Sequence, residues 1–250
     1  MPPIPPSNYR TVDGTYDSDA MRSRMDWEIA LPPRLDAGPA PAPLVLVLPG
    51  ASGVPTDLTT GVGLTGFATA AGLGMAFACP ANGGPLYYHP RASGLDPMAW
   101  ILDEFLPMIE RRFGVGGSTA NRAIYGTSMG GYGALMFAAQ RPRQFCAAVA
   151  CSPAIYESFD AAVTGHPITF DTQSDWDRWG LWNRLSDLNG VPVMINCGDA
   201  DPFAVSARQL LSRIPGAVGG IGRGCHDFGI WRRSAPAQLE FLAGHFTASD

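Results

Sequence analysis

The most constraining feature of this 250-residue chain is the pentapeptide Gly126–Gly130, which reads Gly-Thr-Ser-Met-Gly. It lies between a short apolar run, residues 122–125, and a segment rich in Ala, Leu and Met, residues 129–140. Glycines at the two outer positions permit a tight turn, because side chains there would collide with the strand or helix beside them. G-x-S-x-G can arise by chance in a glycine-rich chain, but a strand before it and a helix after it are the context that the motif requires. We therefore expect a strand, a sharp turn that holds Ser128, and a helix.

Apolar runs and helical patterns alternate along the rest of the chain. Continuous apolar runs, typical of strands buried on both faces, occur at residues 44–48, 74–79, 145–151 and 191–197. The alternation predicts an α/β class with a mainly parallel central sheet flanked by helices. The length suits a single domain over residues 1–250. Within it, residues 155–190 are rich in Trp, Asp and Tyr, and we expect them to form a small helical lid insertion.

Edge strands are expected at both ends of this sheet. The chain enters a first strand around Thr15–Ala20. Residues 24–31 then alternate between apolar and polar side chains, which predicts a half-buried antiparallel strand that turns Glu28 away from the core. Residues 217–222 are expected to form a last short strand.

Residues 61–66, Gly-Val-Gly-Leu-Thr-Gly, match the pattern G-x-G-x-x-G of dinucleotide-binding turns. The match does not directly follow a buried strand, and no acidic residue stands about 20 positions later, as that function requires. We therefore expect this segment to open a helix through Phe67 and Ala71, and we reject the dinucleotide interpretation.

The composition excludes several classes of function. All 17 cationic residues are Arg, so mechanisms that need a lysine, such as Schiff-base, pyridoxal-phosphate and Ser-Lys chemistry, are excluded. The net charge of −5 argues against nucleic acid as a partner. No C-x-x-C occurs and the four histidines are scattered, so we expect no metal site and no cofactor. Buried free thiols are a better interpretation of the five cysteines than a disulfide framework. They are Cys79, Cys146, Cys151, Cys197 and Cys225.

No stretch of the chain approaches 18 apolar residues, and the first residues lack the apolar core of a signal peptide. We expect no integral membrane association and a cytoplasmic location, with secretion still open if a signal peptide was removed. The sequence does not indicate an oligomeric state.

A serine hydroxyl needs a neighbouring base and a carboxylate that orients that base before it can act as a nucleophile. The expected turn at Gly126–Gly130 resembles the nucleophile elbow of the α/β-hydrolase fold. In that fold the chain order is Ser, then Asp or Glu, then His. His89 precedes Ser128, and His166 precedes the strand that would carry the acid. His245 lies near the end of the last helix, where a cation suits the helix dipole. His226, in a glycine-flanked loop, remains as the candidate base.

The acid is expected just after the strand at residues 191–197. Asp199 and Asp201 compete for this role, and Asp201 is preferred. Stabilisation of an oxyanion would come from the backbone N–H groups of Met129, directly after the serine, and of Ala51, in the glycine loop that follows the strand at residues 44–48.

Four segments together resemble the putative-esterase family of α/β hydrolases: GTSMGGYGAL, LPGAS, CGDADPF and GCHDFGIW. That family includes esterase D (S-formylglutathione hydrolase) and the antigen 85 mycolyltransferases, and the similarity extends from about residue 15 to 246. The resemblance implies the α/β-hydrolase fold, acyl-ester or thioester chemistry, no cofactor, and triad roles for Ser128, Asp201 and His226. Pro49, Ser52 and Phe228 depart from the antigen 85 pattern, so trehalose recognition is not implied.

The sequence therefore predicts a serine esterase that hydrolyses carboxylic esters or thioesters of small molecules or lipids through an acyl-enzyme. One alternative is an acyltransferase that moves an acyl group to a sugar or lipid alcohol, and another is a non-catalytic binding module on the same fold. Phe228, Trp231 and Trp179 are candidate substrate contacts. The loop of residues 80–95 either borders the site or is solvated.

Overall fold

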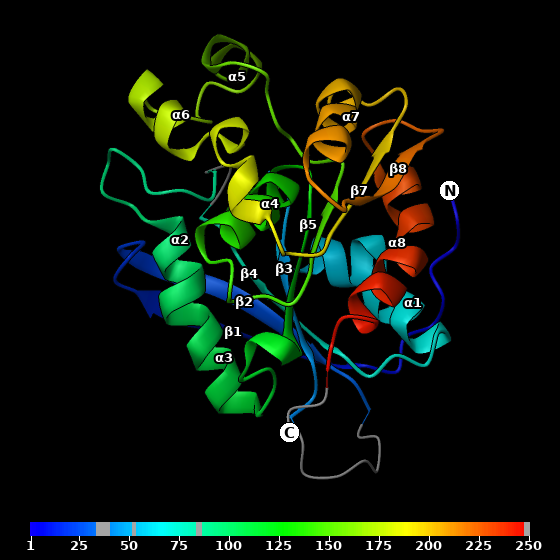
Figure 1. The fold of residues 1–250 in the computed structure, drawn as a ribbon. Coiled ribbons are helices and arrows are strands. Elements are labelled where there is room, and N and C mark those ends of the chain that lie inside the picture. Colours follow the sequence, from blue (N-terminus) through cyan, green and yellow to red (C-terminus); the bar gives the residue numbers. More distant parts are fainter. Residues whose placement is uncertain (34–40, 52–53, 84–86, 248–250) are drawn as a thin grey trace.

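The computed structural model describes residues 1–33, 41–51, 54–83 and 87–247. Its centre is an eight-stranded sheet with the order β1-β2-β4-β3-β5-β6-β7-β8 (Figure 1). The β1–β2 and β2–β4 pairs are antiparallel, whereas every other neighbouring pair is parallel. The predicted α/β fold class with a mainly parallel sheet is therefore confirmed. The strands are β1 (Arg10–Ser18), β2 (Ser23–Leu31), β3 (Leu44–Leu48), β4 (Ala76–Pro80), β5 (Arg122–Thr127), β6 (Ala148–Cys151), β7 (Val193–Gly198) and β8 (Val218–Gly222).

Helices cover both faces of the sheet. The predicted helix after Asp96 is present, with the Asp96 carboxylate accepting a hydrogen bond from the Ala99 amide at 2.9 Å. It runs through α2 (Pro97–Ala99), a π-helical segment (Trp100–Phe105) and α3 (Leu106–Phe113). A second π-helical segment (Asp57–Val62) precedes α1 (Leu64–Ala70). The other helices are α4 (Met129–Gln140), α5 (Phe159–Gly165), α6 (Gln173–Trp179), α7 (Ala204–Arg213) and α8 (Phe228–Ala243), with 3-10 turns at Thr119–Asn121, Leu181–Asn183 and Leu185–Leu188.

Strand β3 shows why a continuous apolar run marks a central strand. All five of its residues are fully buried. Leu44, Leu46 and Leu48 pack into the cluster on the face covered by α3, α4 and α7. The two valines between them pack into the opposite cluster, with α1 and α8. Because both faces are covered, apolar side chains on either face avoid the cost of burying unpaired polar groups.

The first two strands differ from expectation. β1 begins at Arg10 rather than near Thr15, because it pairs with the whole length of β2, from Arg10 opposite Leu31 to Ser18 opposite Ser23. The antiparallel strand over residues 24–31 is present, but its half-buried character is wrong at Glu28, which is 4% exposed because the opposite face is covered as well. Thr59, in the π-helical segment before α1, donates a hydrogen bond to the Glu28 carboxylate.

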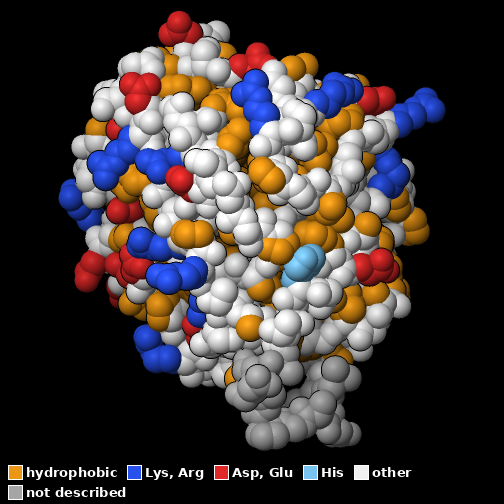
Figure 2. Space-filling view, viewed as in Figure 1, with side chains coloured by type: hydrophobic (Ala, Val, Ile, Leu, Met, Phe, Trp, Pro, Cys, Tyr) orange, Lys and Arg blue, Asp and Glu red, His pale blue; other side chains and the backbone are white. Residues whose placement is uncertain are grey.

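Residues 155–190 contain α5, α6 and two 3-10 turns, and they lie above the carboxyl ends of the strands (Figure 1). Their role as a lid stays a prediction. Basic and acidic side chains are interspersed on the face shown in Figure 2, and the basic ones are all arginines. Within the described residues, no helix combines the length and apolar character needed to cross a bilayer.

The five cysteines are free thiols. Burial is confirmed for Cys79, Cys151 and Cys197, whereas Cys146 is half-buried. Cys225 is exposed, because it lies in the loop beside His226 rather than in a strand.

Candidate active site

Ser128 occupies the turn between β5 and α4, as the pentapeptide predicts. Its backbone has φ 54° and ψ −120°, a conformation that a non-glycine residue adopts only when its surroundings enforce it. Neighbouring backbone provides that constraint. The Ser128 amide donates to the Cys151 carbonyl at 2.9 Å, and the Ala154 amide donates to the Ser128 carbonyl at 2.9 Å.

The two glycines of the motif are required by close packing of the backbone. A Cβ atom at Gly126 would lie 2.0 Å from the Gly130 carbonyl oxygen, and one at Gly130 would lie 1.9 Å from the Leu48 carbonyl oxygen. Either contact is far inside van der Waals distance. The glycines therefore allow the start of α4 to sit against the ends of β3 and β5.

Ser128, His226 and Asp201 form one hydrogen-bonded chain. The Ser128 Oγ atom lies 2.8 Å from His226 Nε2, and His226 Nδ1 lies 2.8 Å from Asp201 Oδ2. The Asp201 side chain is completely buried, whereas the imidazole keeps 25% of its surface exposed. These side chains come from the ends of β5 and β7 and from the loop after β8, so they meet at the carboxyl edge of the sheet.

Asp201 is held in its charged form. Burial would raise the pKa of this carboxyl, but hydrogen bonds from His226 and from the Phe203 amide, at 2.8 Å, outweigh burial and hold the pKa below its usual value. Asp199, the competing candidate, accepts a hydrogen bond from the Gly224 amide at 2.9 Å instead. Asp201 is therefore hydrogen-bonded to the imidazole, whereas Asp199 is hydrogen-bonded to the loop residue Gly224, two positions before His226.

Two aromatic rings pack against the imidazole of His226. Trp231 lies with its ring centroid 5.4 Å away, and Phe203 lies at 5.5 Å. Phe228 packs on Trp231 at 5.1 Å, so it is one ring removed from the imidazole. Sequence reasoning missed Phe203. Its place two residues after the candidate acid, in Asp-Pro-Phe, is the signal that could have pointed to it.

One expected oxyanion donor, Met129, and the loop that carries the other, Ala51, lie next to the serine. Met129 is the first residue of α4 and is buried. Ala51 follows Gly50, and a Cβ atom at Gly50 would lie 3.6 Å from the Ser128 Cβ atom. The glycine loop after β3 therefore packs directly against the elbow. Participation of both amides in oxyanion binding stays a prediction.

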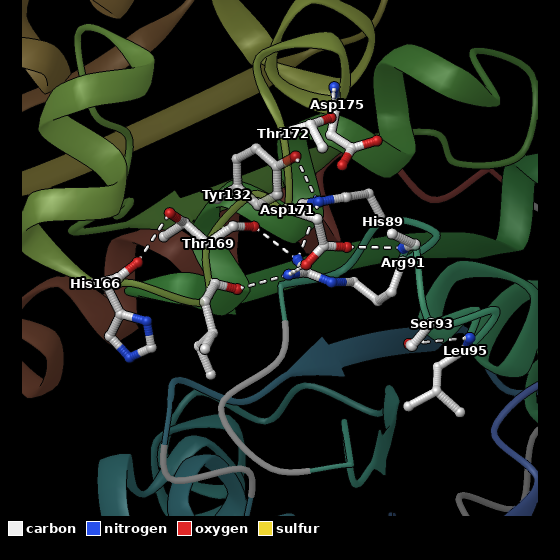
Figure 3. Close-up of polar contacts among 12 residues, drawn as sticks. His89, Arg91, Ser93, Leu95, Tyr132, His166, Thr169, Asp171, Thr172 and Asp175 are labelled. Carbon is white, nitrogen blue, oxygen red and sulfur yellow. Dashed lines mark hydrogen bonds and ion pairs between the residues drawn. The ribbon is translucent and has the colours of Figure 1, made fainter.

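Part of the loop after β4 is buried, so the solvated alternative is wrong for Tyr87–His89 and Arg91, whereas Gly83 and residues 92–94 are exposed. Tyr87, Tyr88 and His89 are at most 3% exposed, and Arg91 is 7% exposed. Figure 3 shows Arg91 reaching the segment before α6, where it forms an ion pair with Asp171 at 2.6 Å.

Trp179 packs against the buried part of the loop after β4. Its ring lies 6.3 Å from that of His89, and its carbonyl accepts a hydrogen bond from the Tyr132 hydroxyl at 2.9 Å. Among the described contacts, none joins Trp179 to the triad side chains, whereas Trp231 touches the imidazole directly. Substrate binding by Trp179, Phe228 and Trp231 stays a prediction.

The described residues contain no group of three or more His, Cys, Asp or Glu side chains arranged to hold a metal ion. What the site offers instead is a hydroxyl beside an imidazole whose other nitrogen contacts a buried carboxylate. Such an arrangement can transfer the hydroxyl proton to the imidazole and stabilise the resulting charge.

Comparisons with known proteins show the family and the fold of this chain. A family model described as putative esterase matches residues 18–212. A solved ferulic acid esterase is 23% identical, with a TM-score of 0.81 and coverage of 95% of this chain and 99% of that one. An S-formylglutathione hydrolase from Staphylococcus aureus is 18% identical, with a TM-score of 0.76 and coverage of 95% and 100%. MPT51 from Mycobacterium tuberculosis is 17% identical, with a TM-score of 0.71 and coverage of 97% and 100%. At these identities the structures show a shared fold.

Proposed function

The chain belongs to the putative esterase family, and from this premise we propose that it hydrolyses carboxylic esters or thioesters with Ser128 as the nucleophile. The observation that carries the proposal is the hydrogen-bonded chain from Ser128 through His226 to Asp201, with both distances at 2.8 Å. A hydroxyl, an imidazole and a buried carboxylate in this order constitute the machinery of acyl transfer.

In the first half of the reaction, the Ser128 oxygen attacks the ester carbonyl carbon while His226 Nε2 accepts the hydroxyl proton. Asp201 holds the imidazole in the required orientation and stabilises its positive charge. The amides of Met129 and Ala51 donate hydrogen bonds to the developing oxyanion, and each such donor contributes about 2.7–4 kcal/mol to the transition state. The bond to the leaving group then breaks, and the departing oxygen or sulfur takes the proton from His226.

In the second half, water attacks the acyl-enzyme and gives its proton to His226. The acid product leaves, and the proton returns to the Ser128 oxygen. The same acyl-enzyme could instead be resolved by a sugar or lipid alcohol, which gives the acyltransferase alternative. Product analysis with and without candidate alcohols separates the two reactions.

Replacement of Ser128 by alanine tests the proposal. We expect Ser128→Ala to lose hydrolysis of p-nitrophenyl acetate and labelling by a fluorophosphonate, because no other group supplies the nucleophile. Ser212→Ala is the matched control, since this exposed hydroxyl at the end of α7 donates to the Gln209 carbonyl of its own helix. A Ser128→Ala protein that hydrolyses and labels like wild type would refute the mechanism. A folded wild-type protein inert to fluorophosphonates would favour the binding-module alternative.

The acyl group can be identified with a series of p-nitrophenyl esters of increasing chain length. The similarity to a ferulic acid esterase adds phenylpropenoyl esters to this series. The rings of Phe203 and Trp231 beside the imidazole support an aromatic substrate.

A further inference from the structure

Tyr88, in the loop after β4, connects the two parts of the proposed oxyanion site. It is fully buried, and its hydroxyl donates a hydrogen bond to the Pro49 carbonyl at 2.6 Å. Pro49 directly follows β3 and stands two positions before Ala51, whose amide is one of the two proposed oxyanion donors. A side chain that is distant in the sequence therefore holds the segment that carries this donor.

The ring of Tyr88 rests on the helix that begins at the other donor. A Cβ atom at Gly133 of α4 would lie 2.6 Å from Tyr88 Cδ2, so the helix backbone is in direct contact with the ring. One turn later, Phe137 packs edge-on against the same ring, with the centroids 5.8 Å apart. Because α4 begins at Met129, the second proposed donor belongs to the helix that supports the ring.

Burial decreases along the glycine loop after β3. Pro49 is buried, Gly50 is half-buried and Ala51 is exposed. A proline has no backbone N–H, so its carbonyl is the only hydrogen-bonding group that Pro49 has. Glycine permits wide rotation of the backbone. The Tyr88 hydroxyl therefore holds the last buried carbonyl before a glycine, which limits how far the Ala51 amide can move.

The Tyr88 hydroxyl acts as a hydrogen-bond donor and not as an acid or a base. Burial raises the pKa of this hydroxyl well above its ordinary value, so the group stays protonated. Among the described hydrogen bonds, none joins it to a side chain of the triad. An effect of Tyr88 on catalysis would therefore be transmitted through the glycine loop.

We propose that Tyr88 is a positioning residue for the oxyanion hole, which keeps the Ala51 amide in a fixed place relative to the Met129 amide. The inference rests on the proposed serine-esterase function and its two oxyanion donors. Both halves of the reaction pass through an oxyanion, so a displaced donor slows acylation and deacylation together. When both steps slow by the same factor, kcat falls and KM stays constant.

Tyr88→Phe removes the hydroxyl and keeps the ring on α4. We expect kcat for p-nitrophenyl acetate to fall about ten- to a hundredfold, with KM within about twofold of wild type, because the donor is displaced but still present. The pH midpoint of kcat/KM should not change, since the imidazole keeps its partners. Inhibition by trifluoroacetophenone, whose adduct with Ser128 carries an oxyanion, should weaken by the same factor as kcat/KM.

Tyr9→Phe is the matched control. Tyr9 ends the N-terminal arm, residues 1–9, and its hydroxyl donates to the carbonyl oxygens of Leu73 and Met75, both at 2.9 Å. These carbonyls precede β4, so they lie at the amino end of that strand, opposite the edge where the triad meets. We expect this variant to lower the free energy of unfolding, as Tyr88→Phe does, and to keep the kcat of wild type.

Phe137→Leu tests the same role without removing the hydroxyl. The smaller side chain loosens the packing of the Tyr88 ring, so kcat should fall by a smaller factor, again at constant KM. Should Tyr88→Phe fail to give a folded protein by circular dichroism, Phe137→Leu becomes the deciding variant, and a wild-type kcat in it overturns the proposal.

The outcomes separate the role of Tyr88 from the proposed function, because fluorophosphonate labelling of wild type is measured alongside. A wild type that hydrolyses and labels, with a folded Tyr88→Phe of unchanged kcat, overturns the role of Tyr88 and leaves the triad mechanism standing. A raised KM or a shifted pH midpoint with unaltered inhibition also overturns that role, since the loss then lies outside the oxyanion hole. An equal loss of kcat in Tyr9→Phe does the same. A wild type that neither labels nor hydrolyses overturns both.

Discussion

Backbone strain concentrates at single residues around the proposed site. Among the described residues, three that are not glycine have a positive φ: Arg22, Ser128 and Ser152. Arg22 lies in the turn between β1 and β2. Ser128 and Ser152 follow directly after the neighbouring strands β5 and β6, so two of the three lie at the edge of the sheet where the triad meets. Strain of this kind persists only where surrounding contacts enforce it, and it is common at functional sites.

At the same scale, Asp201→Asn should lower kcat by about three to four orders of magnitude. An amide at this position can donate a hydrogen bond to the imidazole and stabilise the wrong tautomer, and it cannot stabilise the imidazolium that forms. Because Asp199 contacts the Gly224 amide rather than the imidazole, Asp199→Asn should keep most of the activity. Rates of p-nitrophenyl acetate hydrolysis measure both variants. A severe loss in Asp199→Asn with an active Asp201→Asn would reverse the assignment.

Individual segments of the fold are joined by buried polar contacts that sequence patterns do not display. Arg91, in the loop after β4, contacts Asp171 at 2.6 Å, the Thr169 carbonyl at 2.7 Å and the Ile168 carbonyl at 3.0 Å (Figure 3). The other Asp171 oxygen accepts a hydrogen bond from the Ala92 amide at 2.7 Å. A single arginine therefore fastens the segment between α5 and α6 to the body of the molecule.

The Arg91 contacts predict that two arginine replacements lower the free energy of unfolding by different amounts. Arg91→Gln should destabilise the fold by about 2–4 kcal/mol, because it leaves the Thr169 carbonyl at a buried position and the partly buried Asp171 carboxylate without their guanidinium partner. Arg141→Gln should cost less than about 1 kcal/mol, since the Arg141–Asp103 pair is 3.8 Å long and both side chains are about half exposed. Urea unfolding of the two variants beside wild type provides the comparison. Equal costs would show that the Arg91 contacts do not stabilise the segment.

For the molecule as a whole, two hydrophobic clusters on opposite faces of the sheet supply the core. The larger cluster also surrounds a buried histidine. His89 is fully buried, stacks on Phe170 at 4.8 Å and lies 3.1 Å from the Arg91 guanidinium. Burial, reinforced by the Arg91 charge, lowers the pKa of His89 from 6.5 to about 3. The imidazole is therefore neutral in the folded protein at neutral pH.

The stability of the whole protein should consequently depend on this histidine in mild acid. Below pH 6.5 His89 is protonated in the unfolded chain but stays neutral in the folded protein. The free energy of unfolding therefore falls as the pH drops from about 6.5 towards 3. The limiting slope is about 1.4 kcal/mol per pH unit for one proton. His89→Gln removes this contribution and should flatten the pH dependence, whatever constant offset it adds. Urea unfolding at pH 4, 5, 6 and 7 measures the slopes, and parallel curves would contradict the prediction.

Local patterns in the sequence determined much of this fold. The buried runs, the capped helix after Asp96 and the elbow around Ser128 are each encoded within about 20 neighbouring residues, so they could be predicted without long-range information. The candidate triad could be chosen for a topological reason. Side chains that follow parallel strands meet at one edge of the sheet, and the chain order of Ser128, Asp201 and His226 left few options.

Only the tertiary structure decided which distant side chains touch. The contact between Phe203 and the imidazole, the burial of His89 and Arg91, and the separation of Trp179 from the triad depend on how loops pack across the sheet. The same holds for the glycines at 63 and 66, whose role is to receive the N-terminal arm. These contacts join residues far apart in the chain. Their partners are set by side-chain shape and burial after the sheet has formed, and no periodicity or spacing in the sequence records them.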